Sequence, residues 1–434
     1  MSDSKNKAGQ KKEKSVKLSE DARMRLMLTN KMKEMETEFD ISDHIVIDLG
    51  NAYTKIGYSG EDQPTLTIPS IYARSKLYDT DKKNEISSYD QKMDVFGYEA
   101  TESQYQNDYN ILNLTPGDHK EKTSKEFLEF LRDALENKMG ISPPDYDVIV
   151  NISPIKNEEN IRIYGRLFIE ELGFRALAMV NSSSLSLYST GRTSGLVVQC
   201  GEMRTYTVPI FEGFPLYHAL SKNKLGGKDL TDIYRKGILE ANLNVREEDI
   251  HTLRNIKERT SSVPFIYPCD YYLDENFQDI ILEEIRLYKL PDDTIIDIPR
   301  RCRLLASEML FNPKVVDRED LGLRDLIVHS VRKSEIVNDN LKETLVNNII
   351  LSGGTTMIHG FSERIRKELS GYKDENEWSL EFKPIIVADN NRYISKWIGM
   401  SMIASMSAFD KLFIKKSEYQ ELGEERFSEV AQIF

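Results

Sequence analysis

The sequence predicts an α/β fold of two related lobes that face a cleft, and three observations lead to this class. Apolar runs such as HIVIDLG and SGLVVQCG predict buried strands that end at a glycine turn, and amphipathic stretches follow them. VIDLGNAYTKIGY and VVQCGEMRTYTVPI repeat one pattern of strand, polar turn and returning strand, about one domain length apart. With 434 residues, the chain is also long for a single core.

The first 40 residues predict an extension ahead of the globular part. Residues 1–17 are rich in lysine and poor in large apolar side chains, so we expect a disordered basic tail. From Leu18 to Phe39, apolar residues recur at helical spacing behind Ser19 as the N-cap, which predicts an amphipathic helix. Whether that helix packs on its own domain or docks onto a partner stays open.

Residues 41–434 form the predicted globular domain. Its first strand and turn are HIVIDLG, IYGRLFIEELGF predicts an amphipathic helix, and SGLVVQCG predicts a second strand. NNIILSGGTTMIHGF predicts a third strand and turn before the helix SERIRKEL. We assign about 41–190 and the C-terminal segment of about 392–434 to lobe 1, and about 191–391 to lobe 2.

Two polar stretches interrupt this order. Residues from Ala73 to Asn113 are rich in Asp, Lys, Tyr and Ser and suit an exposed, loop-rich subdomain. Residues from Pro268 to Arg300 have the character of an insertion that carries strands and a turn at Pro291–Asp293.

Composition and charge narrow the class of function. Apolar residues make up 40% and charged residues 30%, which is ordinary for a soluble protein. The net charge of −13 argues against nucleic-acid binding by the whole molecule. Cys200, Cys269 and Cys302 are too few and scattered for a disulfide framework or a zinc site. With no signal-peptide pattern and no apolar run of roughly 18 residues, we expect a soluble intracellular protein without membrane contact.

The first candidate site is the turn that follows the first strand, from Asp48 to Lys55. A tight turn at Gly50 can point backbone amides at a phosphate, while Asp48 can hold a hydrated Mg²⁺ and Lys55 can reach phosphate oxygens. A plain hairpin with a solvated Asp is the alternative, and is more common for the bare pattern. The second candidate site is the turn from Leu351 to Met357, where paired glycines allow close approach of a ligand or form an ordinary tight turn.

Several motifs together resemble actin in order and spacing. They include IDLGNAYTKIGYSGEDQP, LSLYSTGRTSGLVV, VPIFEGFPLYHAL, LGGKDLTD, RNIKER, ILSGGTTMIHGFSERIRKEL and WIGMSMIAS, and they extend from about Asp43 to Phe434. The chain is therefore similar to a divergent actin-related protein. The resemblance implies the actin-like fold, with two related lobes around a nucleotide cleft, and ATP or ADP with Mg²⁺ as cofactor.

The resemblance also assigns residues to the nucleotide site. The matching positions, with Asn51 and Ala52 standing where Ser and Gly are usual, are Asp48, Gly50, Asn51, Ala52, Lys55, Gly201, Gly227, Arg254, Lys257, Glu258, Gly354, Thr355 and Met357. Asp48 is the one matching position to which the resemblance assigns metal binding, and it would hold Mg²⁺ through water. On the adenine side, Ile358 and Tyr393 replace an aromatic residue and a lysine.

The hydrolytic positions depart from the family's pattern. Gln199 replaces the second carboxylate, Met203 the second glycine, Ser182 the glutamine that helps position water, and Tyr206 a nearby histidine. We expect no effective ATP hydrolysis, since each lost group supplied charge or orientation that the others cannot replace. The alternative is that Glu202 takes over the metal role of the missing Asp.

The resemblance also implies a function. Between Ala73 and Phe96, a charged stretch stands where actin has a hydrophobic plug, so self-assembly is disfavoured. We expect a structural or regulatory subunit of a larger cytoskeletal assembly, dynactin-like or ciliary, whose partners are other protein subunits that can include actin or actin-related proteins. A subunit of a nuclear chromatin-remodelling complex and an ATP-hydrolysing actin-like protein are the alternatives.

Overall fold

The computed structural model describes residues 44–75, 94–102, 109–114, 125–155, 158–243, 245, 249–265, 286–337, 341–375, 378–380 and 382–430. The predicted N-terminal extension, Cys269 and most of the two polar stretches lie outside these ranges.

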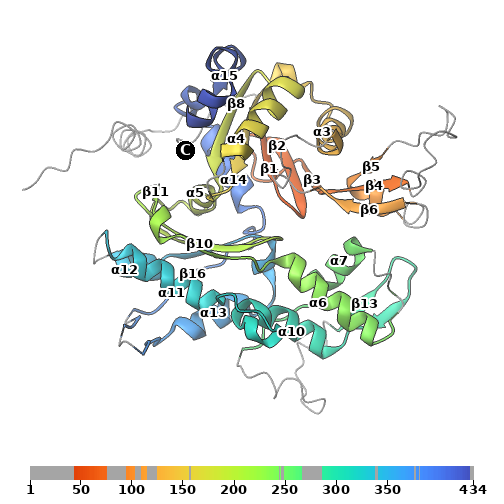
Figure 1. Cartoon of the computed structure of the whole chain (residues 1–434), viewed down its shortest axis with the longest axis vertical. Coiled ribbons are helices and arrows are strands. Elements are labelled where there is room, and N and C mark those ends of the chain that lie inside the picture. Colours follow the sequence, from red (N-terminus) through yellow and green to blue (C-terminus); the bar gives the residue numbers. More distant parts are fainter. Residues whose placement is uncertain are drawn as a thin grey trace, which may run out of the picture. The chain divides into compact units, whose positions relative to one another are not determined.

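The first sheet has six strands in the order β17-β8-β7-β1-β2-β3 (Figure 1). These are β1 (His44–Leu49), β2 (Tyr53–Tyr58), β3 (Leu66–Pro69), β7 (Asp147–Ile152), β8 (Ala176–Asn181) and β17 (Ile414–Lys415). Strand β1 is completely buried, as its apolar run predicts, and pairs in parallel with β7 and antiparallel with β2. The C-terminal segment returns to this sheet because β17 pairs with β8.

The second sheet has the order β11-β10-β9-β15-β16, and β12 also pairs with β10. Its strands are β9 (Gly195–Cys200), β10 (Thr205–Phe211), β11 (Phe214–Pro215), β12 (Ser221–Asn223), β15 (Ile349–Ser352) and β16 (Ile386–Val387). Here β9 pairs antiparallel with β10 and in parallel with β15, as β1 does with β2 and β7. The repeated sequence pattern therefore corresponds to a repeated structural unit, and the predicted α/β class is confirmed.

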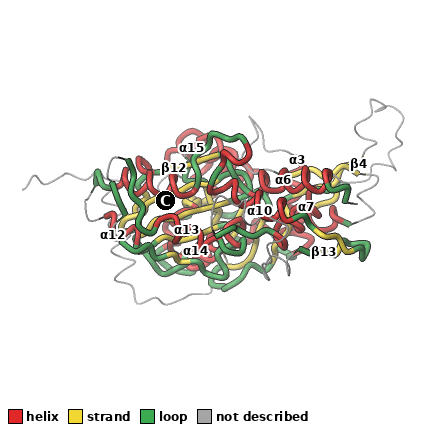
Figure 2. Tube along the Cα trace, turned by 90° about the horizontal axis from the view of Figure 1, so that it is seen from below, coloured by secondary structure: helices red, strands yellow, loops and turns green. Residues whose placement is uncertain are grey.

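Helices cover both sheets (Figures 1 and 2). The core of the first sheet includes side chains from α3 (Lys125–Arg132), α4 (Glu158–Gly165) and α15 (Lys416–Val430). A second core cluster contains side chains of α5 (Ser182–Tyr188) and α14 (Ser395–Ala404), and α14 packs on β1. The core of the second sheet is built with α6 (Gly227–Glu240), α7 (Ile250–Thr260), α10 (Arg300–Phe311), α11 (Leu323–Ser334), α12 (Leu341–Val346) and α13 (Phe361–Leu369). No helix in the described ranges has the length and apolar character to cross a membrane.

Three details refine the predicted elements. The helix predicted from IYGRLFIEELGF is α4 continued by a π-helical segment, Arg166–Glu171. The turn after β15 forms a 3₁₀ helix, Gly354–Met357, and α13 begins at Phe361, one residue before the helix predicted from SERIRKEL. In the second polar stretch, β13 (Leu287–Lys289) and β14 (Ile295–Asp297) form the expected hairpin.

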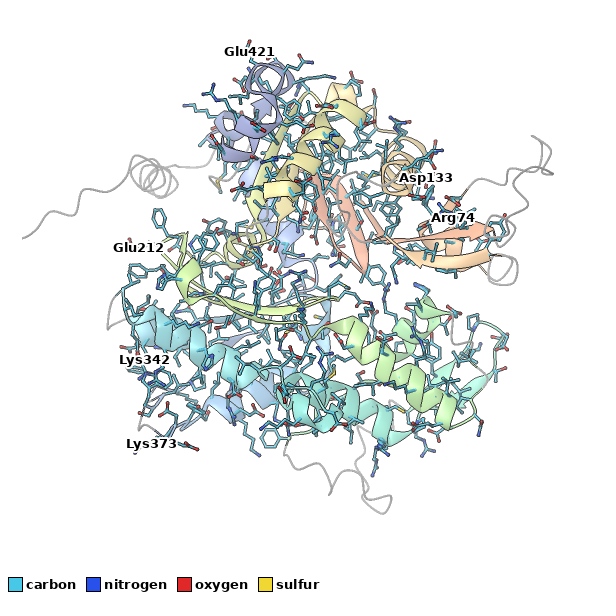
Figure 3. The ribbon with its side chains drawn as sticks, in the orientation of Figure 1. Arg74, Asp133, Glu212, Lys342, Lys373 and Glu421 are labelled. Carbon is cyan, nitrogen blue, oxygen red and sulfur yellow. The ribbon has the colours of Figure 1, made fainter. Side chains whose placement is uncertain are left out.

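The first polar stretch is more regular at its ends than its composition predicts. Strands β4 (Ile71–Ser75), β5 (Val95–Phe96) and β6 (Tyr109–Asn113) form a small sheet. Arg74, labelled in Figure 3, lies 3.0 Å from Asp94 and 2.5 Å from Glu126 of α3. This double ion pair fastens the small sheet to α3, which keeps Asn113 at a fixed place beside the candidate site.

Candidate functional site

Three turns at strand ends supply the backbone of the candidate site. They are Gly50–Ala52 after β1, Gly201–Arg204 after β9 and Gly353–Met357 after β15. In the described part of the chain, the amides of Gly50, Asn51, Ala52, Glu202, Met203, Gly354 and Thr355 donate to no protein acceptor. Amides that are left over at such turns are suited to bind an anion.

Asp48 lies between two lysine side chains at the end of β1. Lys55, directly opposite on β2, places its Nζ 2.9 Å from Oδ2, and Lys396 of α14 places its Nζ 3.1 Å from Oδ1. The second contact is an ion pair, and among the described residues the geometry gives Oδ1 no hydrogen-bond partner. Complete burial would raise the pKa of Asp48, but Lys396 and then Lys55 outweigh it and lower this pKa to about 2.

Glu202 pairs with two cations of α7. One of its oxygens lies 3.1 Å from Arg254 Nη2, and the other lies 3.7 Å from Lys257 Nζ. Burial alone would raise the pKa of Glu202, but Lys257 and Arg254 hold it below its ordinary value. The carboxylate is therefore charged, and both of its oxygens face α7.

Gly227 stands at the centre of this group. Its carbonyl accepts from Lys257 Nζ at 3.0 Å, and its amide donates to the Gly201 carbonyl at 2.9 Å. The Thr355 hydroxyl donates to the same Gly201 carbonyl at 3.0 Å. A Cβ at position 227 would lie too close to Glu202 Oε2, so a side chain there would displace the end of the Glu202 side chain from its present position.

Arg254 joins elements of both sheets. Besides its bond to Glu202, it donates to the Ala52 carbonyl at 3.4 Å and to the Asn113 side chain at 3.5 Å. Only 1% of Arg254 is exposed. A single buried guanidinium thus connects the turn after β1, the end of β6 and the turn after β9.

The third group is neutral and contains Ser182, Gln199 and Tyr206. Tyr206 stands opposite Gln199 in the β9–β10 ladder and donates to its Oε1 at 2.5 Å. The same hydroxyl lies 2.9 Å from Ser182 Oγ at the start of α5. Burial raises the pKa of Tyr206, so the hydroxyl keeps its proton at neutral pH. All three side chains are buried, and the Tyr206 hydroxyl links Ser182 to Gln199 through its two hydrogen bonds.

Comparison with known proteins identifies the family to which this chain belongs. The family model for actin matches residues 40–262 and 245–430. The chain is also 30% identical to "Actin-like protein 7B" of Homo sapiens over 383 residues, covering 87% of this chain and 86% of that protein. The corresponding protein of Mus musculus is 30% identical over 384 residues, with 87% and 85% coverage. The chain belongs to the actin family.

Members of the actin family generally bind ATP or ADP with Mg²⁺. The present residues fit the nucleotide, because unused turn amides and four cationic side chains, Lys55, Arg254, Lys257 and Lys396, gather at the site. They do not fit the metal. Asp48 already faces two ammonium groups, and Gln199 is neutral.

Two hypotheses about the metal stay predictions. Asp48, the predicted metal residue, has Lys396 Nζ 3.1 Å from its Oδ1. Glu202, the alternative to the missing Asp, has oxygens that pair with Arg254 and Lys257.

The remaining predicted residues of the actin-family site lie at its edge. Glu258, Gly354 and Met357 are exposed, as is Tyr393. None of them takes part in the ion pairs described above.

Sequence reasoning missed Lys396, Asn151 and His251. The Asn151 side chain accepts from the Leu49 amide at 2.9 Å and so shapes the turn after β1. Lys396 gave one usable signal, a single charge in the otherwise apolar helix SKWIGMSMIA. His251 gave none, since its importance comes from burial without a partner for Nδ1.

Proposed function

We propose that this protein is a non-hydrolysing actin-related protein that serves as a structural or regulatory subunit of a larger protein assembly. The observation that carries the proposal is the neutral, buried group Ser182–Tyr206–Gln199. Hydrolysis of ATP requires groups that orient the attacking water and stabilise the developing charge.

The chemistry of this group is unsuited to that task. Ser182 and Gln199 carry no charge, and Tyr206 is neither charged nor basic at neutral pH because burial raises its pKa. Its one proton is already donated to Gln199, so the hydroxyl has no proton left to donate to a water at this place. The three substitutions also compensate one another, since the long Tyr206 side chain spans the space between a short Ser182 and Gln199.

Nucleotide binding fits the rest of the site. The unused amides of the three turns and the cations Lys55, Lys257 and Lys396 are suited to a polyphosphate. ATP or ADP would act as a structural ligand, which stabilises the folded protein by mass action and is not consumed.

The assembly is proposed to be a cytoskeletal or ciliary complex in the cytoplasm. The stretch between Ala73 and Phe96 carries a charged sequence in place of a hydrophobic plug, which favours contacts with other subunits over self-assembly. Purified protein is then expected to stay in the supernatant when salt is added.

The decisive experiment combines three measurements on the purified full chain. Extraction and chromatography identify any bound nucleotide, a phosphate-release assay with ATP and Mg²⁺ measures turnover, and sedimentation measures polymer. Release of phosphate at the rate of an actin would overturn the non-hydrolysing role, and salt-induced pelleting would overturn the subunit role. Co-purification of chromatin subunits instead of cytoskeletal ones would indicate that the assembly is a nuclear complex.

A further inference from the structure

Lys396 reaches Asp48 from an unusual position. It lies in the first turn of α14, where a positive charge opposes the helix dipole. The side chain is nonetheless only 14% exposed, and its ammonium points at the buried Asp48 carboxylate, 3.1 Å away. The start of α14 is held in place because Ser395 Oγ lies 2.9 Å from Ser352 Oγ at the end of β15.

The charge around Asp48 is cationic before any ligand binds. One carboxylate faces two ammonium groups, Lys55 and Lys396, so this part of the site has an excess positive charge. On the other side, Glu202 pairs with Arg254 and Lys257, and the carboxyl group of Glu258 interacts with the same two cations. A divalent cation is repelled by the surroundings of Asp48, whereas a polyphosphate anion is attracted.

We propose that Lys396 is a built-in counter-ion which takes the place of the divalent metal, so that this protein binds a nucleoside di- or triphosphate in its metal-free form. The inference rests on the proposed function, because it specifies how the nucleotide is held. Among the described residues, the Lys396 ammonium contacts only Asp48. An ammonium has three donors, so others remain for phosphate oxygens.

A simple structural ion pair is the competing explanation. It accounts for the burial of Asp48, but Lys55 alone already provides a hydrogen-bonded partner at 2.9 Å. Lys396 adds a second cation, 3.1 Å from the other oxygen of a carboxylate that one ammonium group already neutralises.

The test measures binding of a fluorescent ADP and of ATP to the nucleotide-stripped full chain, once with Mg²⁺ and once with EDTA. We expect dissociation constants that agree within about twofold, because the metal makes no contribution. A dissociation constant at least about tenfold weaker in EDTA would overturn the proposal. Absence of binding in both buffers would overturn it as well, while the non-hydrolysing subunit role would stand.

The Lys396→Met variant separates a counter-ion from a structural residue. It is expected to bind metal-free nucleotide at least about tenfold more weakly, and to recover affinity when Mg²⁺ is added, because Asp48 can then accept metal-bound water. Lys396→Arg should retain metal-free binding. Lys415→Met, at an exposed position of β17, is the matched control and should bind like the unmodified chain.

Two outcomes with the variants count against the proposal. If Lys396→Met and the unmodified chain bound nucleotide with equal affinity in EDTA, Lys396 would not belong to the nucleotide site. An equal loss in EDTA and in Mg²⁺, in a variant that melts normally by circular dichroism, would show that Lys396 does not substitute for a metal. If the variant fails to fold, the comparison of EDTA with Mg²⁺ on the unmodified chain still decides the main claim.

Discussion

Tyr206 and Gln199 occupy the same relative positions in the second sheet as Lys55 and Asp48 in the first. Each pair consists of directly opposed residues in the hairpin that ends at a turn of the site. The first pair is an ion pair of 2.9 Å, and the second is a neutral hydrogen bond of 2.5 Å. The two halves of the repeat have therefore kept their backbone and diverged in charge, so that the Asp48–Lys55 pair is ionised and the Gln199–Tyr206 pair is neutral.

Removal of the Tyr206 hydroxyl should be costly for stability. In Tyr206→Phe, the buried Gln199 Oε1 loses its donor and Ser182 loses its neighbour, so we expect the free energy of unfolding to fall by about 1–3 kcal/mol. Denaturant unfolding measures this difference. Tyr393→Phe, at a position that is 45% exposed, is the control and should change little. Equal stability of both variants would mean that the hydroxyl group contributes nothing to this network.

A single reversion to a carboxylate should not create an ATPase. In Gln199→Asp the shorter side chain no longer reaches the Tyr206 hydroxyl in the same way, and a buried charge is placed beside neutral groups, so stability should fall. Phosphate release from ATP with Mg²⁺ should stay at background, because Tyr206 and Ser182 are unchanged. Turnover by this single variant would contradict the idea that the three substitutions act together.

Much of the fold was predictable because its signals are local. The buried strands β1 and β9, their glycine turns and the returning strands each follow from a short stretch of sequence, and the repeat becomes visible when the two stretches are compared. The four altered hydrolytic positions, Ser182, Gln199, Met203 and Tyr206, were identified from the resemblance of several motifs to actin, and their effect on hydrolysis stays a prediction.

The electrostatics of the site were not predictable in this way. Asp48 was predicted to help hold a metal, but its charge environment depends on Lys396, which α14 brings to β1 only in the folded chain. The direction of the Glu202 side chain depends likewise on α7 and on the absence of a Cβ at Gly227. Contacts between distant segments decide which charges meet, and periodicity carries no information about them.

The Arg254–Glu202 pair should behave as a buried, coupled pair. In Arg254→Met, Glu202 loses its closest cation while it remains buried, so we expect a loss of about 3–5 kcal/mol in the free energy of unfolding. Glu202→Gln in the Arg254→Met background should cost much less than Glu202→Gln alone, since the charge it removes has already lost the closer of its two cations.

The full double-mutant cycle by urea unfolding gives the coupling energy. A matched pair on the surface, Arg324 and Asp325, provides the control cycle and should show weak coupling because both side chains are partly exposed. Additive effects of Arg254→Met and Glu202→Gln would show that the two charges do not depend on each other.

His251 should make the protein lose stability between pH 6.5 and pH 4. Burial, followed by the nearby Arg254, lowers the pKa of His251 from 6.5 to about 4, against a smaller opposite effect of Asp249. Below pH 6.5 the unfolded chain therefore binds a proton that the folded protein does not, and stability falls as the pH falls. The full effect, reached near pH 4, is about 3 kcal/mol.

The His251→Phe variant isolates this contribution. The new ring can keep the edge contact with Tyr98, whose ring centroid lies 6.2 Å from that of His251, and it has no proton to bind. Between pH 7 and pH 4, the unfolding free energy of the variant should therefore fall by about 3 kcal/mol less than that of the unmodified chain. His218→Gln, at an exposed position, should leave the pH profile unchanged. Parallel pH profiles for His251→Phe and the unmodified chain would mean that His251 titrates alike in the folded and unfolded states.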